Sequence, residues 1–315
     1  MAKNVIEKDT QAFLDMLAKG GGPPIYTLSP KDARGVLSGA QGGDVKKLPA
    51  DIEDRNIPFK HEISIRIVRP SGNKNKLPVT MYFHGGGWVL GGKDTHDRLI
   101  RDIANGANCA VVFVNYSPSP EAQYPIPIEE AYAATKWVAE NAGEINVDAS
   151  KLAVSGDSVG GNMAIAVTIM CKERKGPKLV FQCLFYPVTD AAFDNESYKL
   201  FQNGPWLTLP AMKWFWDQYA PDHSVWGEPT ASPLRAPTDL FKGMPPALVI
   251  TDEFDVLRDE GEHFAKKLID AGVTVTVARY LGTIHDFVML NALAHTPACK
   301  AAIAQACECL KNAFK

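Results

Sequence analysis

The sequence lacks any long uninterrupted hydrophobic run, although 46% of its 315 residues are hydrophobic. No stretch is apolar over the length needed to span a bilayer, and the first residues lack the charged-then-apolar pattern of a signal peptide. The 33 lysines and arginines nearly balance the 36 aspartates and glutamates, which leaves a formal net charge of −3 and no basic block. These absences argue against a membrane span and against nucleic acid as a partner.

Cysteine is also sparse, and its placement suggests neither disulfides nor a metal site. The six cysteines are scattered and lie mostly inside apolar runs, at positions 109, 171, 183, 299, 307 and 309. Cys307 and Cys309 form the one close pair, and the sequence offers no further ligands to complete a zinc site around them. We therefore expect reduced core cysteines, no bound metal and a cytoplasmic protein.

What the chain does have, from about residue 60 onward, is an alternation of short apolar runs with segments of helical periodicity. This alternation is typical of an α/β protein whose mostly parallel sheet is wrapped by helices, and the length suits one large unit with an added subdomain. The expected strands are 62–68, 79–84, 109–115, 151–156, 179–186, 246–251 and 273–280. The expected helices are 95–107, 127–142, 158–173, 257–271 and 297–314.

Two segments fall outside this alternation, and we interpret both as a cap over the sheet. Residues 1–50 contain a short amphipathic helix and a Gly-Pro loop, and residues 190–235 contain four of the six tryptophans. The core of the fold is then expected in two parts, residues 51–189 and 236–315. The tryptophan-rich cluster could line a pocket or could be ordinary core beneath a long insertion.

A glycine-rich stretch, "GDSVG" at 156–160, lies on the turn between an expected strand and an expected helix. Gly156 and Gly160 have no Cβ, so a sharp turn can bring them against neighbouring backbone. Ser158 would then stand at the positive end of the helix, where the N–H of Val159 could receive an oxyanion. No Gly-Lys-Ser/Thr follows and no Gly-x-Gly-x-x-Gly is present, which argues against a phosphate-binding loop. The context predicts that Ser158 is a nucleophile and that no cofactor is needed.

A second glycine-rich segment, "HGGGW" at 84–88, follows directly after the expected strand 79–84. Acyl transfer requires two N–H donors converging on one developing charge, and consecutive glycines can turn their amides inward. Gly85, Gly86 and Gly87 are therefore candidates for an oxyanion hole together with Val159, although the sequence does not say which two point inward. We expect His84 to be a structural hydrogen-bonding residue of this loop.

A serine hydroxyl needs a base within hydrogen-bond reach and a carboxylate that orients the base. His285 follows a late strand, so a loop at the carboxyl edge of the sheet could carry it to the serine. His61 precedes an edge strand, and we expect the others at the surface: His96, His223, His263 and His295. Of Asp252, Glu253 and Asp255, we favour Asp255 as the acid because it lies further into its loop.

Taken together, "HGGGW" (84–88), "GDSVGGN" (156–162), "DVLRDEG" (255–261) and "IHDF" (284–287) resemble the hormone-sensitive-lipase-like esterases, also called bacterial family IV. The resemblance extends over most of the chain. It implies an α/β-hydrolase sheet of about eight strands, a mainly helical cap and hydrolysis of short acyl esters. It also implies that Ser158 is the nucleophile, His285 the general base and then acid, and Asp255 the orienting carboxylate.

The sequence departs from this family's usual pattern at several positions. Residues 115–121 read "NYSPSPE", which loses an Asp and an Arg, and Val159 and Val256 replace an alanine and a proline. Asp286 replaces the glycine after the base. A carboxylate there could stabilise the imidazolium of His285 or could face solvent, and we favour solvent. These departures affect specificity more than activity.

The sequence thus predicts a serine carboxylesterase that acts on small-molecule, short-chain acyl esters. Trp88, Trp206, Trp214 and Phe215 are expected to bound the substrate pocket. Activity should rise as His285 loses its proton, near pH 6 to 7 if its pKa is roughly normal. The alternatives are an amidase, a specialised acetyl-ester hydrolase or a ligand-binding receptor. The resemblance also implies pairing through an edge strand such as 273–280, so a homodimer is possible, and a monomer is equally consistent.

Overall fold

A single eight-stranded sheet organises the computed structural model, which describes residues 5–315. The strands are β1 (Ala50–Pro58), β2 (Glu62–Pro70), β3 (Leu77–Phe83), β4 (Ala110–Asn115), β5 (Val147–Asp157), β6 (Phe181–Phe185), β7 (Ala247–Phe254) and β8 (Val275–Ile284). They lie in the order β1-β2-β4-β3-β5-β6-β7-β8, and β2 is antiparallel to both of its neighbours. The other neighbours are parallel. The expected α/β fold with a mostly parallel sheet is confirmed.

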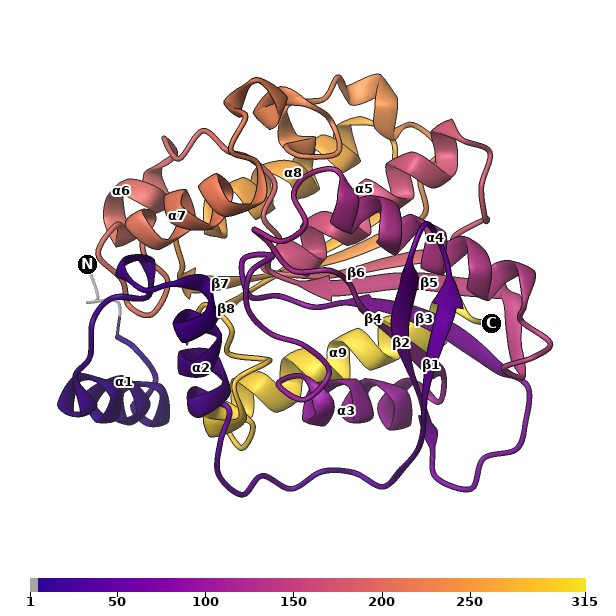
Figure 1. Cartoon of the computed structure of the whole chain (residues 1–315), viewed down its shortest axis with the longest axis horizontal. Helices are drawn as coiled ribbons and strands as arrows, with labels where there is room; N and C mark the ends of the chain where they lie inside the picture. Colours follow the sequence, from indigo (N-terminus) through magenta and orange to yellow (C-terminus); the bar gives the residue numbers. More distant parts are fainter. Residues whose placement is uncertain (1–4) are drawn as a thin grey trace.

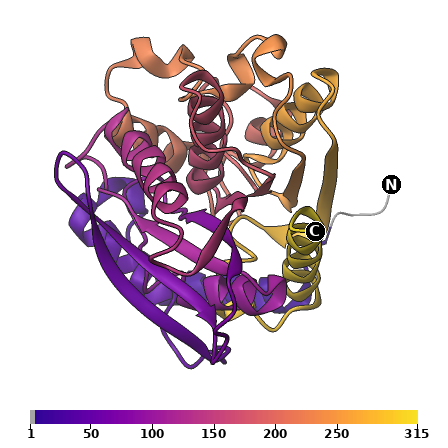
Figure 2. The same cartoon turned by 90° about the vertical axis from the view of Figure 1, so that its right-hand side faces the viewer.

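Helices cover both faces of this sheet (Figure 1). The helices α3 (Asp97–Ala107) and α9 (Pro297–Ala313) lie on one face, and α4 (Ile126–Glu140), α5 (Val159–Glu173) and α8 (Arg258–Asp270) lie on the other. Figure 2 shows the twist of the sheet from the β1–β2 hairpin to β8. Each of the five helices expected from the sequence is present, with ends shifted by no more than two residues.

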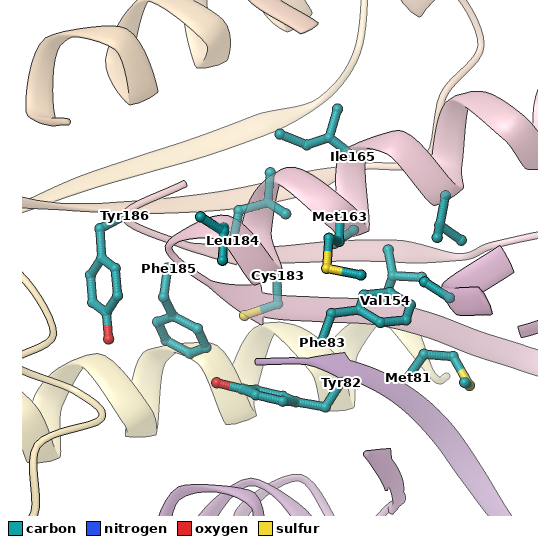
Figure 3. Packing of buried hydrophobic residues seen from close by; sticks show 14 of the residues in the cluster. Met81, Tyr82, Phe83, Val154, Met163, Ile165, Cys183, Leu184, Phe185 and Tyr186 are labelled. Carbon is teal, nitrogen blue, oxygen red and sulfur yellow. The ribbon is translucent and has the colours of Figure 1, made fainter. Parts of the chain in front are cut away.

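The central strands are apolar on both sides because helices cover both faces. Every residue of β6 is buried, as are five of the six residues of β4. Successive side chains point to opposite faces, so Phe185 points toward α9 and Leu184 toward α5 (Figure 3). Tyr82 of β3 also points toward α9. This packing fixes the strand ends from which the site is built.

Four further helices lie together beyond the carboxyl ends of the parallel strands (Figure 1). Two come from the N-terminal segment, α1 (Lys8–Gly20) and α2 (Pro30–Ala40), and two from the insertion after β6, α6 (Glu196–Phe201) and α7 (Leu209–Tyr219). Segments far apart in sequence therefore meet above the edge where a parallel sheet places its loops.

One strand, β1, is absent from the expectations because its sequence, "ADIEDRNIP", is polar. It is an edge strand, and backbone pairing with β2 holds it from Ala50 opposite Pro70 to Pro58 opposite Glu62. Arg66 of β2 also donates two hydrogen bonds, of 2.8 and 2.9 Å, to the carboxylate of Asp54. Tertiary pairing overrides local propensity here.

The cysteines and the hydrophobic helices agree with the composition of the chain. All six cysteines are free thiols, and five of them are buried. Across residues 5–315, no helix has both the length and the hydrophobicity to cross a membrane.

Candidate active site

Ser158 occupies the turn between β5 and α5 in a conformation that L-residues rarely adopt. Its φ is +56°, and its side chain is nearly buried. A Cβ added at Gly160 would lie 2.0 Å from the carbonyl oxygen of Phe83, and one added at Gly156 would lie 2.3 Å from the carbonyl carbon of Gly160. Both positions therefore exclude side chains, which permits the sharp, strained turn that presents the serine.

The ends of two other strands bring a base and an acid to this serine. His285 follows β8 and Asp255 follows β7. The Nε2 atom of His285 lies 2.9 Å from Ser158 Oγ, and its Nδ1 lies 2.7 Å from Asp255 Oδ2. The backbone N–H of Leu257 donates to the other oxygen of Asp255 at 3.0 Å. The structure thus joins the three expected side chains in one hydrogen-bonded line.

The glycine loop presents two amides rather than three to the serine. The N–H of Gly85 donates to Asp157 Oδ1 at 3.1 Å, so it is already used, and our inclusion of Gly85 among the candidate oxyanion donors was wrong. Gly86 and Gly87 have φ values of +106° and +63° and line the same cavity as Ser158. The N–H groups of Gly86, Gly87 and Val159 have no acceptor among residues 5–315. These three amides are free to bind an anionic oxygen.

His84 stabilises this loop, as expected. Its Nδ1 donates to the carbonyl oxygen of Gly85 at 2.8 Å, and its ring stacks on Tyr116 at 4.2 Å between centroids. The hydroxyl of Tyr116 donates to the backbone oxygen of His84 at 2.9 Å. Burial lowers the pKa of His84 to about 3, so its imidazole is neutral at physiological pH.

The environment of His285 makes it a stronger base than an ordinary histidine. Burial by itself would lower its pKa, but the carboxylates of Asp255 and Asp286 outweigh burial and raise the pKa to about 9. Asp286 Oδ1 lies 3.5 Å from His285 Nε2. The pKa of His285 thus lies above the normal value on which the expected rise of activity near pH 6 to 7 depended.

Asp286 does not face solvent, so that expectation was also wrong. Only 8% of the residue is exposed, and its Oδ2 accepts a hydrogen bond of 2.8 Å from the indole N–H of Trp206. The backbone of Asp286 is in the left-handed region, with φ of +69°. This conformation and the contact with Trp206 together hold the carboxylate beside His285.

A cavity of about 260 Å³ opens at Ser158, and its lining is mostly apolar. The N-terminal segment contributes residues from Pro23 to Leu37, and the insertion contributes residues from Trp206 to Phe215. Trp206 and Phe215 line the cavity as expected. Trp88 and Trp214 do not, so these two were wrongly assigned to the pocket. Trp88 is fully buried, its φ is +59°, and its ring stacks on Tyr219 at 4.0 Å between centroids.

The geometry of this site agrees with comparisons to known proteins. The sequence model of a protein family with the description 'alpha/beta hydrolase fold' matches residues 80–289. The chain belongs to that family. The expected resemblance to hormone-sensitive-lipase-like esterases is thereby confirmed at the family level.

Relatives of this α/β hydrolase share most of their length with it. It is 37% identical to the carboxylesterase NlhH of Mycobacterium tuberculosis, over 84% of this chain and 83% of the relative. It is 31% identical to the ethyl acetate hydrolase of Pseudomonas putida, over 91% and 93% of the two chains. A thermostable esterase of Pseudomonas putida ECU1011 has a solved structure that is 52% identical, with a TM-score of 0.96 and coverage of 100% and 99%.

The hydrolase holds one further carboxyl group close to the site. Asp252 is completely buried, and neither of its side-chain oxygens has a hydrogen-bond partner among residues 5–315. Burial and the neighbouring carboxylates of Asp255 and Asp286 raise the pKa of Asp252 well above its usual range. The structure places Asp255 on His285, as expected, and leaves Asp252 buried beside it, where the neutral carboxyl is favoured.

Potential metal ligands in the described part of the hydrolase gather at this same point. Ligand atoms of Asp252, Asp255 and His285 lie within 4.8 Å of one another, and no other such group of three occurs among residues 5–315. Two of these atoms already form the 2.7 Å hydrogen bond between Asp255 and His285. We therefore interpret His285 and Asp255 as a base and its orienting carboxylate, and Asp252 as an additional buried carboxyl beside them.

Sequence reasoning missed His96, which it placed at the surface. His96 is fully buried, and its Nε2 lies 3.2 Å from Asp157 Oδ2. It lies at the start of a helix, where polar residues are often exposed, so the sequence favoured a surface position. The glycine pair just before it, Gly91 and Gly92, is the one local signal of a turn toward the core.

Proposed function

We propose that this protein is a serine carboxylesterase that hydrolyses short-chain acyl esters through a covalent acyl-enzyme. The proposal is carried by one observation, the hydrogen-bonded line from Asp255 through His285 to Ser158 at the floor of an apolar cavity. The esterase names of several relatives support it. No residue of this arrangement depends on a cofactor.

In the proposed reaction, neutral His285 takes the proton of Ser158 as its oxygen attacks the ester carbonyl. The N–H groups of Gly86, Gly87 and Val159 bind the oxygen that becomes negative in the tetrahedral intermediate. Asp255 keeps Nδ1 protonated and stabilises the imidazolium while it exists. His285 then gives its proton to the leaving alcohol. Water attacks the acyl-serine with the same base and releases the acid.

The direct test of this function replaces the nucleophile. Ser158→Ala should lower the turnover rate of p-nitrophenyl acetate at least about 10³-fold, because the attacking oxygen is gone. Thermal unfolding should remain that of the wild type, because the substitution deletes one atom from a turn shaped by neighbouring glycines. Retention of full activity in this variant would end the proposal.

We propose an acyl-chain limit of about eight carbons, set by the walls of the cavity. Its volume is about 260 Å³, and a Cβ added at Gly87 would lie 2.0 Å from the ring of Phe215. This ring therefore packs directly on the oxyanion loop and restricts the space beside Ser158. Phe215→Ala should shift the preferred p-nitrophenyl ester to a longer chain. Trp214→Ala, on the same helix but outside the cavity, should not.

A series of p-nitrophenyl esters of increasing acyl-chain length, measured with the wild type, tests the proposed limit. Rates that rise steadily from acetate toward long-chain esters would contradict a bounded pocket. The same panel should include anilides and acetylated sugars, because an amidase or a specialised acetyl-ester hydrolase would use the same triad.

We also propose that residues 1–50 and 190–235 form the cap and that residues 51–189 and 236–315 form the core. Support comes from the cavity, because both proposed cap segments contribute to its lining. The boundary at residue 50 falls where β1 begins. Limited proteolysis should cleave the cap loops first, and protection by a bound inhibitor would tie the cap to substrate binding.

Finally, we propose a cytoplasmic protein that forms a homodimer through the outer edge of β8 before Gly282, whose carbonyl oxygen already accepts from the N–H of Glu7. The six reduced thiols suit a reducing compartment. The strand β8 is paired on one side with β7, and its Val277 and Leu281 are exposed. An edge strand of this kind can pair with a second copy. Sedimentation of the purified protein at the monomer mass would reject the dimer.

A further inference from the structure

Asp157 precedes Ser158 in the chain, is completely buried, and has no part in the reaction described above. Its Oδ1 accepts hydrogen bonds from the hydroxyl of Tyr82 at 2.7 Å and from the N–H of Gly85 at 3.1 Å. Its Oδ2 lies 3.2 Å from Nε2 of His96. One carboxylate thus joins β3, the glycine loop and the start of α3 directly behind the proposed nucleophile.

The contacts of Asp157 favour its charged form. Burial by itself would raise its pKa, but His96 and the hydroxyl of Tyr82 outweigh burial, and the pKa is lowered. An ionised carboxylate only accepts hydrogen bonds, so Nε2 of His96 must carry a proton. Nδ1 of His96 lies 2.9 Å from the hydroxyl oxygen of Thr95, and that hydroxyl donates to the backbone oxygen of Gly92 at 2.9 Å.

The carboxylate is in close contact with the loop that carries the free amides. A Cβ added at Gly85 would lie 2.3 Å from Asp157 Oδ2, so the two groups touch with no space between them. The hydrogen bond from the N–H of Gly85 fixes the orientation of that peptide group. Gly86 and Gly87 follow immediately, and their amides must point in directions that this peptide group allows.

We propose that Asp157 is a positioning residue for the oxyanion hole. With Tyr82 and His96 it forms a buried anionic anchor that holds Gly85, so that the N–H groups of Gly86 and Gly87 converge on the substrate oxygen at Ser158. This inference rests on the proposed function of Ser158. Because the oxyanion exists only after attack, the anchor stabilises the transition state and contributes little to binding of the uncharged ester.

The test compares Asp157→Ala, Asp157→Asn and Tyr82→Phe in the full chain with p-nitrophenyl butyrate. Removal of an oxyanion donor costs about 10²- to 10³-fold in kcat, and misplacement of two donors should approach the lower figure for Asp157→Ala. Asp157→Asn should recover at least about tenfold of this loss, because its amide oxygen can still accept from Gly85. Tyr82→Phe removes one donor of the anchor and should lower kcat about three- to tenfold.

Two further measurements separate positioning from a general structural role. A trifluoromethyl ketone, which forms an anionic adduct with serine, should bind more weakly in proportion to the loss in kcat. Inhibition by the product alcohol, and KM, should change less than about threefold. Tyr219→Phe is the matched control, since the hydroxyl of Tyr219 is buried without a partner among the described residues, and it should leave kcat unchanged.

Different results would overturn the anchor role of Asp157 and the proposed function of Ser158. Equal losses in kcat and in product binding, or no loss of kcat in Asp157→Ala, would overturn the anchor. If Asp157→Ala does not fold, Tyr82→Phe and Asp157→Asn decide in the same way. Failure of the proposed function itself would show as activity in Ser158→Ala, whereas failure of the anchor alone leaves that variant inactive.

Discussion

Replacement of Asp286 by asparagine tests the electrostatics of the site most sharply. His285 must be neutral to accept the proton of Ser158, so a raised pKa means that activity is lost as pH falls below about 9. The increase from 6.5 to about 9 corresponds to about 3 kcal/mol at 1.36 kcal/mol per pH unit. The carboxylates of Asp255, at 2.7 Å, and Asp286, at 3.5 Å, are its main causes, and the carboxylate of Asp157 adds to them.

Asp286 contributes less than Asp255, because its oxygen is farther from the ring and Asp255 also forms a hydrogen bond with it, so we take the share of Asp286 as about one pH unit. Asp286→Asn should therefore move the midpoint of kcat/KM from about pH 9 to about pH 8. At pH 7 the variant should be up to about tenfold faster than the wild type, because about ten times more of its His285 is neutral. The asparagine oxygen can still accept the hydrogen bond from Trp206, so the geometry is kept.

The assay is p-nitrophenyl acetate hydrolysis from pH 5 to pH 10, corrected for the spontaneous reaction at each pH. Asp252→Asn is the matched control, because it replaces a neighbouring buried carboxyl whose raised pKa favours the uncharged form. A midpoint that stays the same or rises in Asp286→Asn would refute the reasoning, as would an equal shift in the control.

Two other substitutions follow from the same geometry. Asp252→Asn should raise the free energy of unfolding by about 2 kcal/mol near pH 8 and by less near pH 5. A carboxyl whose pKa is raised on folding stabilises the protein below its unfolded pKa of about 4, and this stability is lost as pH rises. Denaturant melts of the wild type and of Asp252→Asn measure the difference in unfolding free energy. The same difference at both pH values would count against a raised pKa of Asp252. Gly86→Ala should lower kcat at least about 10²-fold, because its Cβ would lie 2.4 Å from the carbonyl oxygen of Leu90 and the loop must move. Stopped-flow acylation rates measure this loss, and a rate near that of the wild type would show that Gly86 is not a donor.

The parts of the molecule that the sequence predicted well are those set by local pattern. Apolar runs gave the central strands because burial on both faces demands them, and "GDSVG" marked its own turn because only glycine fits at 156 and 160. His285 and Asp255 could be chosen because each follows a late strand of a parallel sheet, whose carboxyl ends meet at one edge.

The parts that sequence reasoning missed depend on contacts between distant segments. Trp88 was expected to bound the substrate pocket, but it stacks on Tyr219 of α7, 131 positions later by residue number. Asp286 reads as a polar residue of a loop, but the indole of Trp206 holds it in the cavity. No local pattern encodes either partner. The amide of Gly85 was likewise assigned to the wrong role because its acceptor, Asp157, lies on another strand.

The central claim is that Ser158 forms a covalent intermediate, and mass spectrometry after reaction with a fluorophosphonate tests it most directly. The account predicts one phosphonyl group per chain, on the peptide that contains Ser158, formed at a rate that rises with pH through about 9. Ser158→Ala should remain unlabelled. Labelling of a different residue, or no labelling of a wild-type protein that still hydrolyses esters, would contradict the account.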